Sequence, residues 1–374
     1  MKQMKKIILS VIMALLCAGP AAAPGQAGSA AQPAARAWPE ADRIFHGDPR
    51  WRGGDGASSV DLGRGRILWL FGDSLVCESP PYERKRAGLV RNSVMVETGP
   101  DPLTASAAFF WGREKGRPAA FFPGRGAAWR WPASGVALSG RLLVFLMNVK
   151  PAENALGFAP AGWSAVFVKK PSQSPELWRA AEAKLPPGRQ DGLTAVLLAG
   201  SGGAAPLGGH LLCWGQAAAT GEAFLMRFSL AEAARGDLSR PSYWDGPEHG
   251  FVPPERLRGR KPAPLFSGAP AEFSVHRQSP SGAFLVISAL GFGSADLSLR
   301  RGPRPSGPFS EPASFFRPPE WGRPGVLLYA AKAHPEISAP GGLAVTYASN
   351  SLDPETVLAD ESLYYPRFVL LEMN

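Results

Sequence analysis

One pattern recurs five times along this chain: a glycine-containing turn is followed by an apolar run of six to eight residues that ends in a polar side chain. The runs start at residues 66, 141, 210, 283 and 342, so consecutive starts lie 75, 69, 73 and 59 residues apart. Their bounds are Arg66–Asp73, Arg141–Asn148, His210–Gln216, Ala283–Ser288 and Gly342–Ser349. Recurrence of one unit along a chain is typical of repeat folds such as propellers.

Each apolar run is expected to be the second strand of a hairpin, because a small-residue or alternating segment precedes each turn. These preceding segments are Ala57–Leu62, Gly135–Ser139, Ala195–Ala199, Phe273–Arg277 and Ile337–Ala339. Third strands are predicted at Asn92–Glu97, Ser164–Lys169, Ala223–Ser229 and Leu297–Arg301, and further strands at Ala107–Trp111, Phe315–Phe316 and Tyr365–Glu372.

The sequence therefore predicts an all-β fold, namely a five-bladed β-propeller with four-stranded antiparallel blades around a central channel. A blade buries both faces of its sheet against its neighbours, which explains why the middle strands are apolar throughout. The 43 glycines and 38 prolines favour many turns, and helix is expected only at Ser174–Lys184 and Leu230–Arg235. A β-sandwich with similar hairpins is the alternative.

The N-terminus has the pattern of a secretory signal peptide, which predicts an exported protein of the periplasm or the extracellular space. Three lysines precede the apolar segment Ile7–Leu16, which is too short to span a bilayer. Leu16 precedes Cys17 where a lipoprotein signal requires a small residue, which argues against lipidation. We expect residues 1–30 to be the signal, a disordered lead-in to about residue 37, and one propeller domain over residues 38–374.

The distribution of charge and of apolar runs argues against nucleic-acid binding and against a transmembrane segment. The net charge is +9, but the basic residues are scattered and not interleaved with aromatic residues, so no nucleic-acid partner is predicted. No apolar run elsewhere in the chain is long enough for a transmembrane segment either. We expect a monomer.

Cys77 and Cys213 remain after signal removal, either as one disulfide or as two separate buried thiols. No residue spacing indicates a metal site.

Several short motifs occur in order across the five units. They are Gly53–Val60, Leu68–Val76, Arg91–Ser93, Ala271–Val275, Leu299–Arg301 with Ser306–Ser310, Tyr329–Glu336 and Tyr365–Phe368. Together they resemble a family of exported five-bladed β-propellers, long carried as a domain of unknown function, that includes endo-D-arabinanases. The chain is also distantly similar to glycosidase propellers of the arabinanase and β-xylosidase type.

Three acids are the candidate catalytic residues, because glycosidases place two carboxyl groups beside the bond to be cut. Asp55 precedes the first strand of unit one, where the resemblance implies a base or nucleophile; its alternative role is to form the Gly-Gly-Asp-Gly turn. Glu272 precedes the first strand of unit four, where a general acid would lie, or it forms a salt bridge at the strand edge. Glu336 is expected to open the first strand of unit five, or to belong to a turn stiffened by Pro335.

Further polar residues of these motifs are expected to bind substrate or to hold the catalytic acids. They are Asp73, Arg91, Asn92, Lys332, His334, Tyr365 and Arg367. Trp51, Trp131 and Tyr365 are candidate stacking platforms for a sugar ring, with the blade core as the alternative for each. The resemblance implies no organic cofactor, although such propellers often hold a structural Ca²⁺ in the channel.

The resemblance implies an exported carbohydrate-active protein. A glycoside hydrolase acting on an arabinan-like or other cell-envelope or environmental glycan is the favoured function. Arabinanase-type propellers use an Asp of the second blade to tune the acid, but this chain has Trp131-Pro-Ala-Ser in that place. The missing acid supports the alternative of a non-catalytic exported propeller that binds carbohydrate or a protein partner.

Overall fold

The computed structural model describes residues 33–153, 157–187, 192–198, 209–278, 282–290 and 295–373. The strands among these residues pair into antiparallel β-sheets, so the all-β prediction with four-stranded antiparallel sheets is confirmed. No helix among the described residues is long and apolar enough to cross a membrane. The predicted signal peptide, residues 1–30, lies outside the described part of the chain.

Five of the described sheets have four or five strands each, and their strands follow one another in the sheet. The first has β3 (Ser58–Gly63), β4 (Arg66–Phe71), β7 (Ser93–Thr98) and β8 (Ser106–Phe110). The second has β11 (Trp129–Leu138), β12 (Arg141–Pro151), β13 (Phe158–Val168) and β14 (Ala180–Glu182). The third has β15 (Gly192–Leu198), β16 (His210–Ala217), β17 (Glu222–Ser229), β18 (Ser242–Trp244) and β19 (Phe251–Val252).

The last two large sheets follow the same plan. The fourth has β20 (Phe273–Arg277), β21 (Phe284–Leu290), β22 (Asp296–Gly302) and β23 (Ala313–Phe316). The fifth has β24 (Val326–His334), β25 (Gly342–Ser351), β26 (Pro366–Glu372) and, on its edge, β1 (Ala35–Ala37). Two small sheets consist of β2 (Trp51–Gly54), β5 (Ser74–Val76) and β6 (Gly88–Val90), and of β9 (Gly112–Glu114) and β10 (Arg117–Ala119).

The helices are short and lie in the connections. They are α2 (Pro39–Asp42), η2 (Arg43–His46), η3 (Arg84–Arg86), η4 (Pro175–Leu177), α3 (Leu230–Ala233), α4 (Pro254–Leu257) and α5 (Pro354–Ala359). The turn of helix predicted near Leu230 is therefore confirmed. The helix predicted over 174–184 is wrong, because β14 in this segment pairs with β13 as an edge strand. Tertiary pairing has overridden the local helix propensity there.

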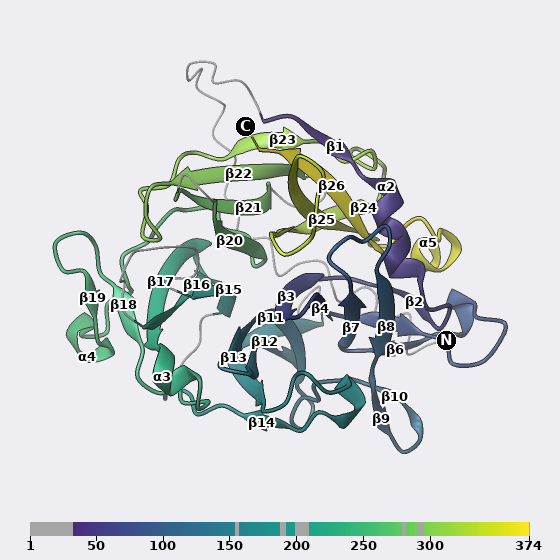
Figure 1. Cartoon of the computed structure of the whole chain (residues 1–374), viewed down its shortest axis with the longest axis horizontal. Coiled ribbons are helices and arrows are strands. Elements are labelled where there is room, and N and C mark those ends of the chain that lie inside the picture. The colour runs from purple at the N-terminus through teal and green to yellow at the C-terminus, as the bar shows by residue number, and fades with distance from the viewer. Residues whose placement is uncertain are drawn as a thin grey trace.

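The first strands of the five large sheets contact one another in the order β3, β11, β15, β20, β24 and back to β3. Figure 1 shows the sheets following one another around a common centre. The chain ends join in one sheet, because Ala35 of β1 pairs with Leu371 of β26. The disordered lead-in predicted to about residue 37 is therefore too long: β1 completes the sheet formed by the C-terminal strands.

All five apolar runs form strands, as predicted, namely β4, β12, β16, β21 and β25. The first strand predicted for unit five is wrong. Ile337–Ala339 lies after the strand, and the inner strand is β24, which ends at His334. Pro335 has no N–H for a strand ladder, which is consistent with the strand ending before it.

The core lies within and between the sheets. Leu68, Trp69 and Leu70 on β4 are fully buried although they point to alternate faces, as expected for the middle strand of a stacked sheet. Leu70 packs in one cluster with Leu142 and Val144 of the second sheet. Cys77 and Cys213 are free buried thiols and belong to different clusters, so they are not paired in this structure.

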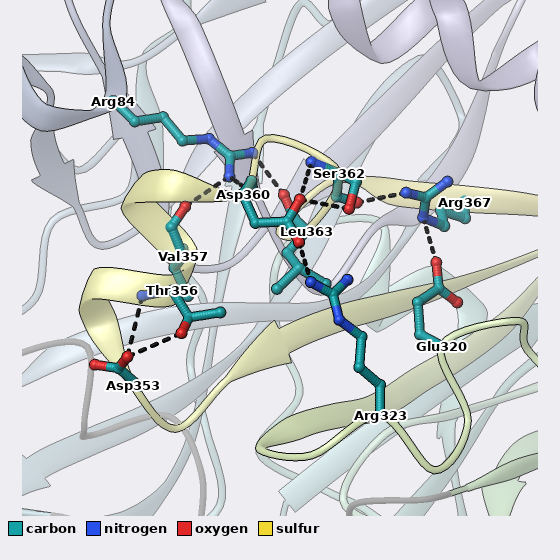
Figure 2. A network of polar contacts seen from close by, with 10 residues as sticks. All are labelled: Arg84, Glu320, Arg323, Asp353, Thr356, Val357, Asp360, Ser362, Leu363 and Arg367. Carbon is teal, nitrogen blue, oxygen red and sulfur yellow. Dashed lines mark hydrogen bonds and ion pairs between the residues drawn. The ribbon is translucent and has the colours of Figure 1, made fainter.

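Arg84 in η3 is a buried cation that ties β2 to the segment around α5, and Figure 2 shows its guanidinium directed at that segment. Its guanidinium donates to the carbonyl oxygens of Arg52, Val357, Asp360 and Leu363 at 2.6–2.8 Å. These bonds hold the residues that lead to Tyr364. The Tyr364 carbonyl in turn accepts from Gly54 N, one residue before Asp55.

Glu97 on β7 is a fully buried acid next to Trp69. Its Oε2 accepts from Trp69 Nε1 at 2.6 Å, whereas Oε1 has no hydrogen-bond partner among the described residues. Burial raises the pKa of Glu97 from 4.5 to about 7. The folded protein therefore holds a proton on Glu97 at pH values where the unfolded chain has released it.

We expect Glu97 to make stability fall as pH rises from about 4.5 to about 7, because the unfolded chain ionises first. The loss is on the order of 3 kcal/mol across the window. In Glu97→Gln the loss should be absent, which urea unfolding at several pH values measures. The exposed Glu114→Gln is the control, and an unchanged pH slope in Glu97→Gln would contradict the assignment.

Candidate functional site

A pocket lies where the first strands of the large sheets begin. Asp55 lies in the turn before β3 and Glu272 directly before β20, whereas Tyr329 and Lys332 lie within β24. The lining residues are Asp55, Gly56, Gly72, Trp131, Pro132, Ala133, Met147, Thr194, Ala271, Glu272, Tyr329 and Lys332. Two of the three predicted catalytic acids thus share one pocket.

Asp55 is held by the backbone on both sides and by one side chain. Gly72 N donates to the Asp55 carbonyl at 2.7 Å, and Gly54 N donates to Tyr364 O at 2.8 Å. The Tyr329 hydroxyl donates to Asp55 Oδ2 at 2.7 Å and accepts from the Asn350 amide. With 7% of its surface exposed, Asp55 has little freedom to turn away from the pocket.

Gly72 leaves the space that the Asp55 carboxyl group occupies. A Cβ atom at position 72 would lie 2.4 Å from Asp55 Oδ1, a distance that non-bonded atoms do not tolerate. Gly56 has a φ of +85°, which favours glycine at the turn that follows Asp55. Gly72 is thus required by the position of the Asp55 carboxyl group, and Gly56 by the turn that follows Asp55.

We expect Gly72→Ala to displace the Asp55 carboxyl group and to lower kcat/KM about a hundredfold, since misplacement by about 1 Å has an effect of this size. The test compares kcat/KM with the free energy of unfolding for the same variant. Gly88→Ala is the control, because a Cβ there meets only Val76 O at 3.9 Å. Full activity in a folded Gly72→Ala protein would show that the Asp55 position is unimportant.

Glu272 forms an ion pair with a buried lysine. Lys332 Nζ lies 2.6 Å from Glu272 Oε1 and also donates to the carbonyl oxygen of Gly56. The Lys332 side chain is 4% exposed and that of Glu272 is 29% exposed, so the carboxylate is the accessible partner. The lysine thereby links the turn after Asp55 to the acid on the fourth sheet.

Irregularities in three inner strands aim side chains at this pocket. The register of β24 shifts between Tyr329 and Lys332, and Ala330 within the shift has a φ of +57°. Further shifts occur in β11 at Ala133 and in β15 at Thr194. β-Bulges commonly re-aim side chains next to active sites.

The electrostatics distinguish Asp55 from an ordinary surface acid. Burial raises the pKa of Asp55 well above its usual value, and the nearby Asp73 and Glu272 carboxylates raise it further. The Tyr329 hydrogen bond and the Lys332 charge oppose this effect without cancelling it. Asp55 therefore holds its proton to higher pH than an exposed aspartic acid does.

Asp73 and Arg91 lie behind the pocket. Asp73 is buried and accepts from Trp131 Nε1 at 2.6 Å and from Arg91 Nη1 at 2.8 Å. Burial raises the pKa of Asp73, against the opposing charge of Arg91. These contacts orient Trp131, which lines the pocket and is only partly buried.

Glu336 lies away from Asp55 and Glu272, so the structure does not bring the three predicted acids together. It follows β24 in a turn instead of opening the strand, which corrects the prediction. It lines a different pocket, formed by later residues of the inner strands such as Ser59, Val136 and His276. Ala133, Thr194 and Lys332 border both pockets.

The other predicted binding residues lie outside the pocket. Asn92 is fully buried and bonds to backbone atoms of Phe122 and Arg130. His334 is buried between the hydroxyls of Ser59 and Thr346. Tyr365 and Trp51 are buried in the hydrophobic cluster that contains Trp69 of the first sheet. Arg367 forms ion pairs with Glu320 and Asp42.

The described residues show no cluster of acidic or imidazole side chains for a calcium ion. No group of three or more His, Cys, Asp or Glu side chains among them is arranged to hold a metal ion. The pocket that holds Asp55 and Glu272 also contains the Lys332 ammonium, which opposes a cation there.

Comparison with known proteins places the chain in a family. Residues 40–373 match a family model described as a domain of unknown function, DUF5005. The chain belongs to the DUF5005 family. No curated protein matches its sequence.

Solved structures resemble this DUF5005 protein to different degrees. A Bacteroides ovatus protein provisionally described as a hydrolase is 16% identical with a TM-score of 0.66, and the match covers 88% of each chain. A GH43_1 enzyme from Xanthomonas citri in complex with xylotriose is 13% identical, with a TM-score of 0.47 over 88% of this chain and 91% of that one. RS223-β-xylosidase is 10% identical, with a TM-score of 0.48 over 86% and 92%. The match to the Bacteroides ovatus protein, at 16% identity, shows a shared fold.

Two site residues of this DUF5005 protein were missed by sequence reasoning. Tyr329 belongs to the motif that contains Lys332, but no alternation in β24 indicates which side chains face the pocket, because the strand is interrupted by a bulge. Gly72 precedes the predicted Asp73 and carries no side-chain signal of its own. The sequence signal that could have indicated Gly72 is its position between an apolar strand and an acid.

Proposed function

We propose that this protein is a glycoside hydrolase in which Asp55 and Glu272 act on the same glycosidic bond. The observation that carries the proposal is their convergence in one pocket, with Asp55 buried and Glu272 paired to Lys332. Glycosidases need one protonated and one ionised carboxyl group beside the scissile bond. The two environments supply this difference.

In the proposed reaction Asp55 donates its proton to the leaving oxygen as the bond from the anomeric carbon to that oxygen breaks. Glu272 attacks the anomeric carbon or takes a proton from the attacking water. Water adds across the broken bond, and one new reducing end forms. These roles are the reverse of those that the family resemblance implies, and they rest on the buried position of Asp55 and on the Lys332 ion pair.

The rest of the pocket suits one face of a sugar ring. Trp131, Pro132 and Met147 offer apolar surface, on which the C–H face of a sugar packs. The Asp73 hydrogen bond fixes the plane of the Trp131 indole. Removing the Asp73 carboxylate should therefore weaken substrate binding through Trp131, which makes Asp73 a positioning residue in this proposal.

The proposal includes the finer features of fold and location. We infer a single five-bladed β-propeller, supported by the closed order of contacts among the five inner strands. We further infer export from the N-terminal signal pattern and an arabinan-like glycan as substrate from the family resemblance. Figure 1 lets the reader follow the order of the sheets.

A reducing-end assay tests the proposal. The purified protein is incubated with L-arabinan, D-arabinan, arabinoxylan and xylan, and with 4-nitrophenyl arabinofuranosides and xylosides. We expect new reducing ends from at least one substrate, and none from Glu272→Gln. Binding to a glycan without any release of reducing ends would instead favour a non-catalytic binding protein. The absence of a carboxyl group in Trp131–Ser134 supports that alternative.

A further inference from the structure

Two consecutive hydrogen bonds lead from β25 of the fifth sheet to the candidate acid. Asn350 Nδ2 lies 3.3 Å from the Tyr329 hydroxyl oxygen, which lies 2.7 Å from Asp55 Oδ2. Resting on the proposed function, we propose that Asn350 is a positioning residue for Asp55. It fixes the direction of the Tyr329 hydrogen bond and thereby assigns the proton that Asp55 transfers to Oδ1.

The direction of the two hydrogen bonds follows from the other contact of Asn350. Its Oδ1 accepts from the backbone N–H of Ser351 at 2.8 Å, so the amide nitrogen is the atom that faces Tyr329. An amide nitrogen only donates, and a tyrosine hydroxyl carries a single proton. The Tyr329 oxygen therefore accepts from Asn350, which leaves its one proton for Asp55. Asn350 is fully buried, so bulk water does not compete for its amide group.

The same contacts distinguish the two oxygens of the Asp55 carboxyl group. Oδ2 accepts from Tyr329, so the proton of the neutral acid belongs on Oδ1. Oδ1 has no hydrogen-bond partner among the described residues, and it is not one of their fully buried atoms that lack a partner. It lies next to Gly72, which lines the pocket together with Asp55. Oδ1 is therefore the oxygen that can present a proton to a ligand in the pocket.

The Tyr329 hydrogen bond becomes stronger during the proposed proton transfer. The O–H bond at Asp55 Oδ1 breaks, the proton moves to the glycosidic oxygen, and the electron pair of the O–H bond stays on the carboxylate. A hydrogen bond to an ionised carboxyl group is roughly twice as strong as one to a neutral group. Tyr329 therefore stabilises the transition state more than the bound substrate. Asn350 contributes only through Tyr329, by keeping the hydroxyl proton directed at Oδ2.

The test uses Tyr329→Phe, Asn350→Leu and the variant that combines them, with Asn350→Ala as a second way to remove the amide without adding volume. Tyr347→Phe is the matched control, because Tyr347 is also buried and donates to a carboxylate, Glu320, outside the pocket. The kcat/KM value is measured as a function of pH. Independently of activity, the ionisation of Asp55 in the free protein is followed by infrared difference spectra against the same protein with Asp55→Asn.

We expect Tyr329→Phe to lower kcat/KM about ten- to a hundredfold, the effect of one lost hydrogen bond to a charged group. The same change should raise the pKa of Asp55, because its ionised form loses a donor. The Asn350 variants should act in the same directions, with a loss of about three- to fivefold, and should have no further effect in the Tyr329→Phe background. The other titratable and charged groups near Asp55 stay the same in all these variants: Asp73, Glu272, Lys332 and Tyr364.

The control Tyr347→Phe should leave both measurements unchanged. An Asp55 ionisation that is the same in wild type and Tyr329→Phe would overturn the inference, and so would Asn350 effects that persist undiminished in the Tyr329→Phe background. If the infrared spectra show the expected changes in a protein that hydrolyses nothing, the proposed function fails, whereas the control of Asp55 protonation by Asn350 stands.

Discussion

Replacing Glu272 by Gln should abolish hydrolysis of every substrate, whereas replacing Asp55 by Asn should spare substrates with good leaving groups. The reason is that Asp55 is proposed to protonate the leaving oxygen, and an acidic phenol departs without that proton. We expect a loss of about 10³-fold or more for Asp55→Asn on a glycan and a much smaller loss on a 2,4-dinitrophenyl glycoside. Steady-state kinetics on both substrates measure the difference.

Glu336→Gln is the control for this experiment, because Glu336 lines the other pocket and should leave activity unchanged. A small nucleophile such as azide should restore turnover of an activated glycoside in Glu272→Gln if the carboxylate attacks carbon. The opposite pattern, with Glu272→Gln sparing the activated substrate and Asp55→Asn losing it, would mean that the two roles are exchanged.

Replacing Arg84 by Met should lower the free energy of unfolding by about 3–5 kcal/mol, because four carbonyl oxygens lose their donor inside the protein. Methionine keeps an unbranched apolar chain of similar length, so the change removes mainly the donors. Urea denaturation measures the difference. Arg86→Met in the same 3-10 helix is exposed and should change stability by less than about 0.5 kcal/mol.

The same variant should also reduce activity, because the Arg84 bonds shown in Figure 2 hold the segment that leads to Tyr364. The Tyr364 carbonyl oxygen accepts from Gly54 N, next to Asp55. The Tyr364 hydroxyl further donates to the backbone oxygen of Asp73. A normal unfolding free energy in Arg84→Met would contradict the structural role given to this cation.

The repeated strands could be predicted from the sequence because their signals are local. A glycine turn followed by an apolar run is visible within ten residues or so, and each such run forms a strand. Asp55 and Glu272 could be found by the same means, since both lie in the turns that lead into inner strands. The position of Glu336 was predicted wrongly because the inner strand of unit five was expected at Ile337–Ala339, whereas β24 ends at His334.

The rest of the site depends on contacts that no local pattern records. Lys332 meets Glu272 across two sheets, and Tyr329 reaches Asp55 across 274 residues of sequence. Arg84 looks like a surface residue in a basic run, Arg84-Lys-Arg, yet it is 1% exposed. Burial of this kind is decided by which loops pack together, and hydrophobic periodicity does not report on it.

A double-mutant cycle tests most directly whether Asp55 and Glu272 serve one reaction. The kcat/KM values of wild type, Asp55→Asn, Glu272→Gln and the double variant are measured on a glycan that the wild type hydrolyses. Groups that act on the same bond are strongly non-additive, so the double variant should be about as slow as the slower single variant. Losses that multiply independently, or a double variant with substantial remaining activity, would contradict the account.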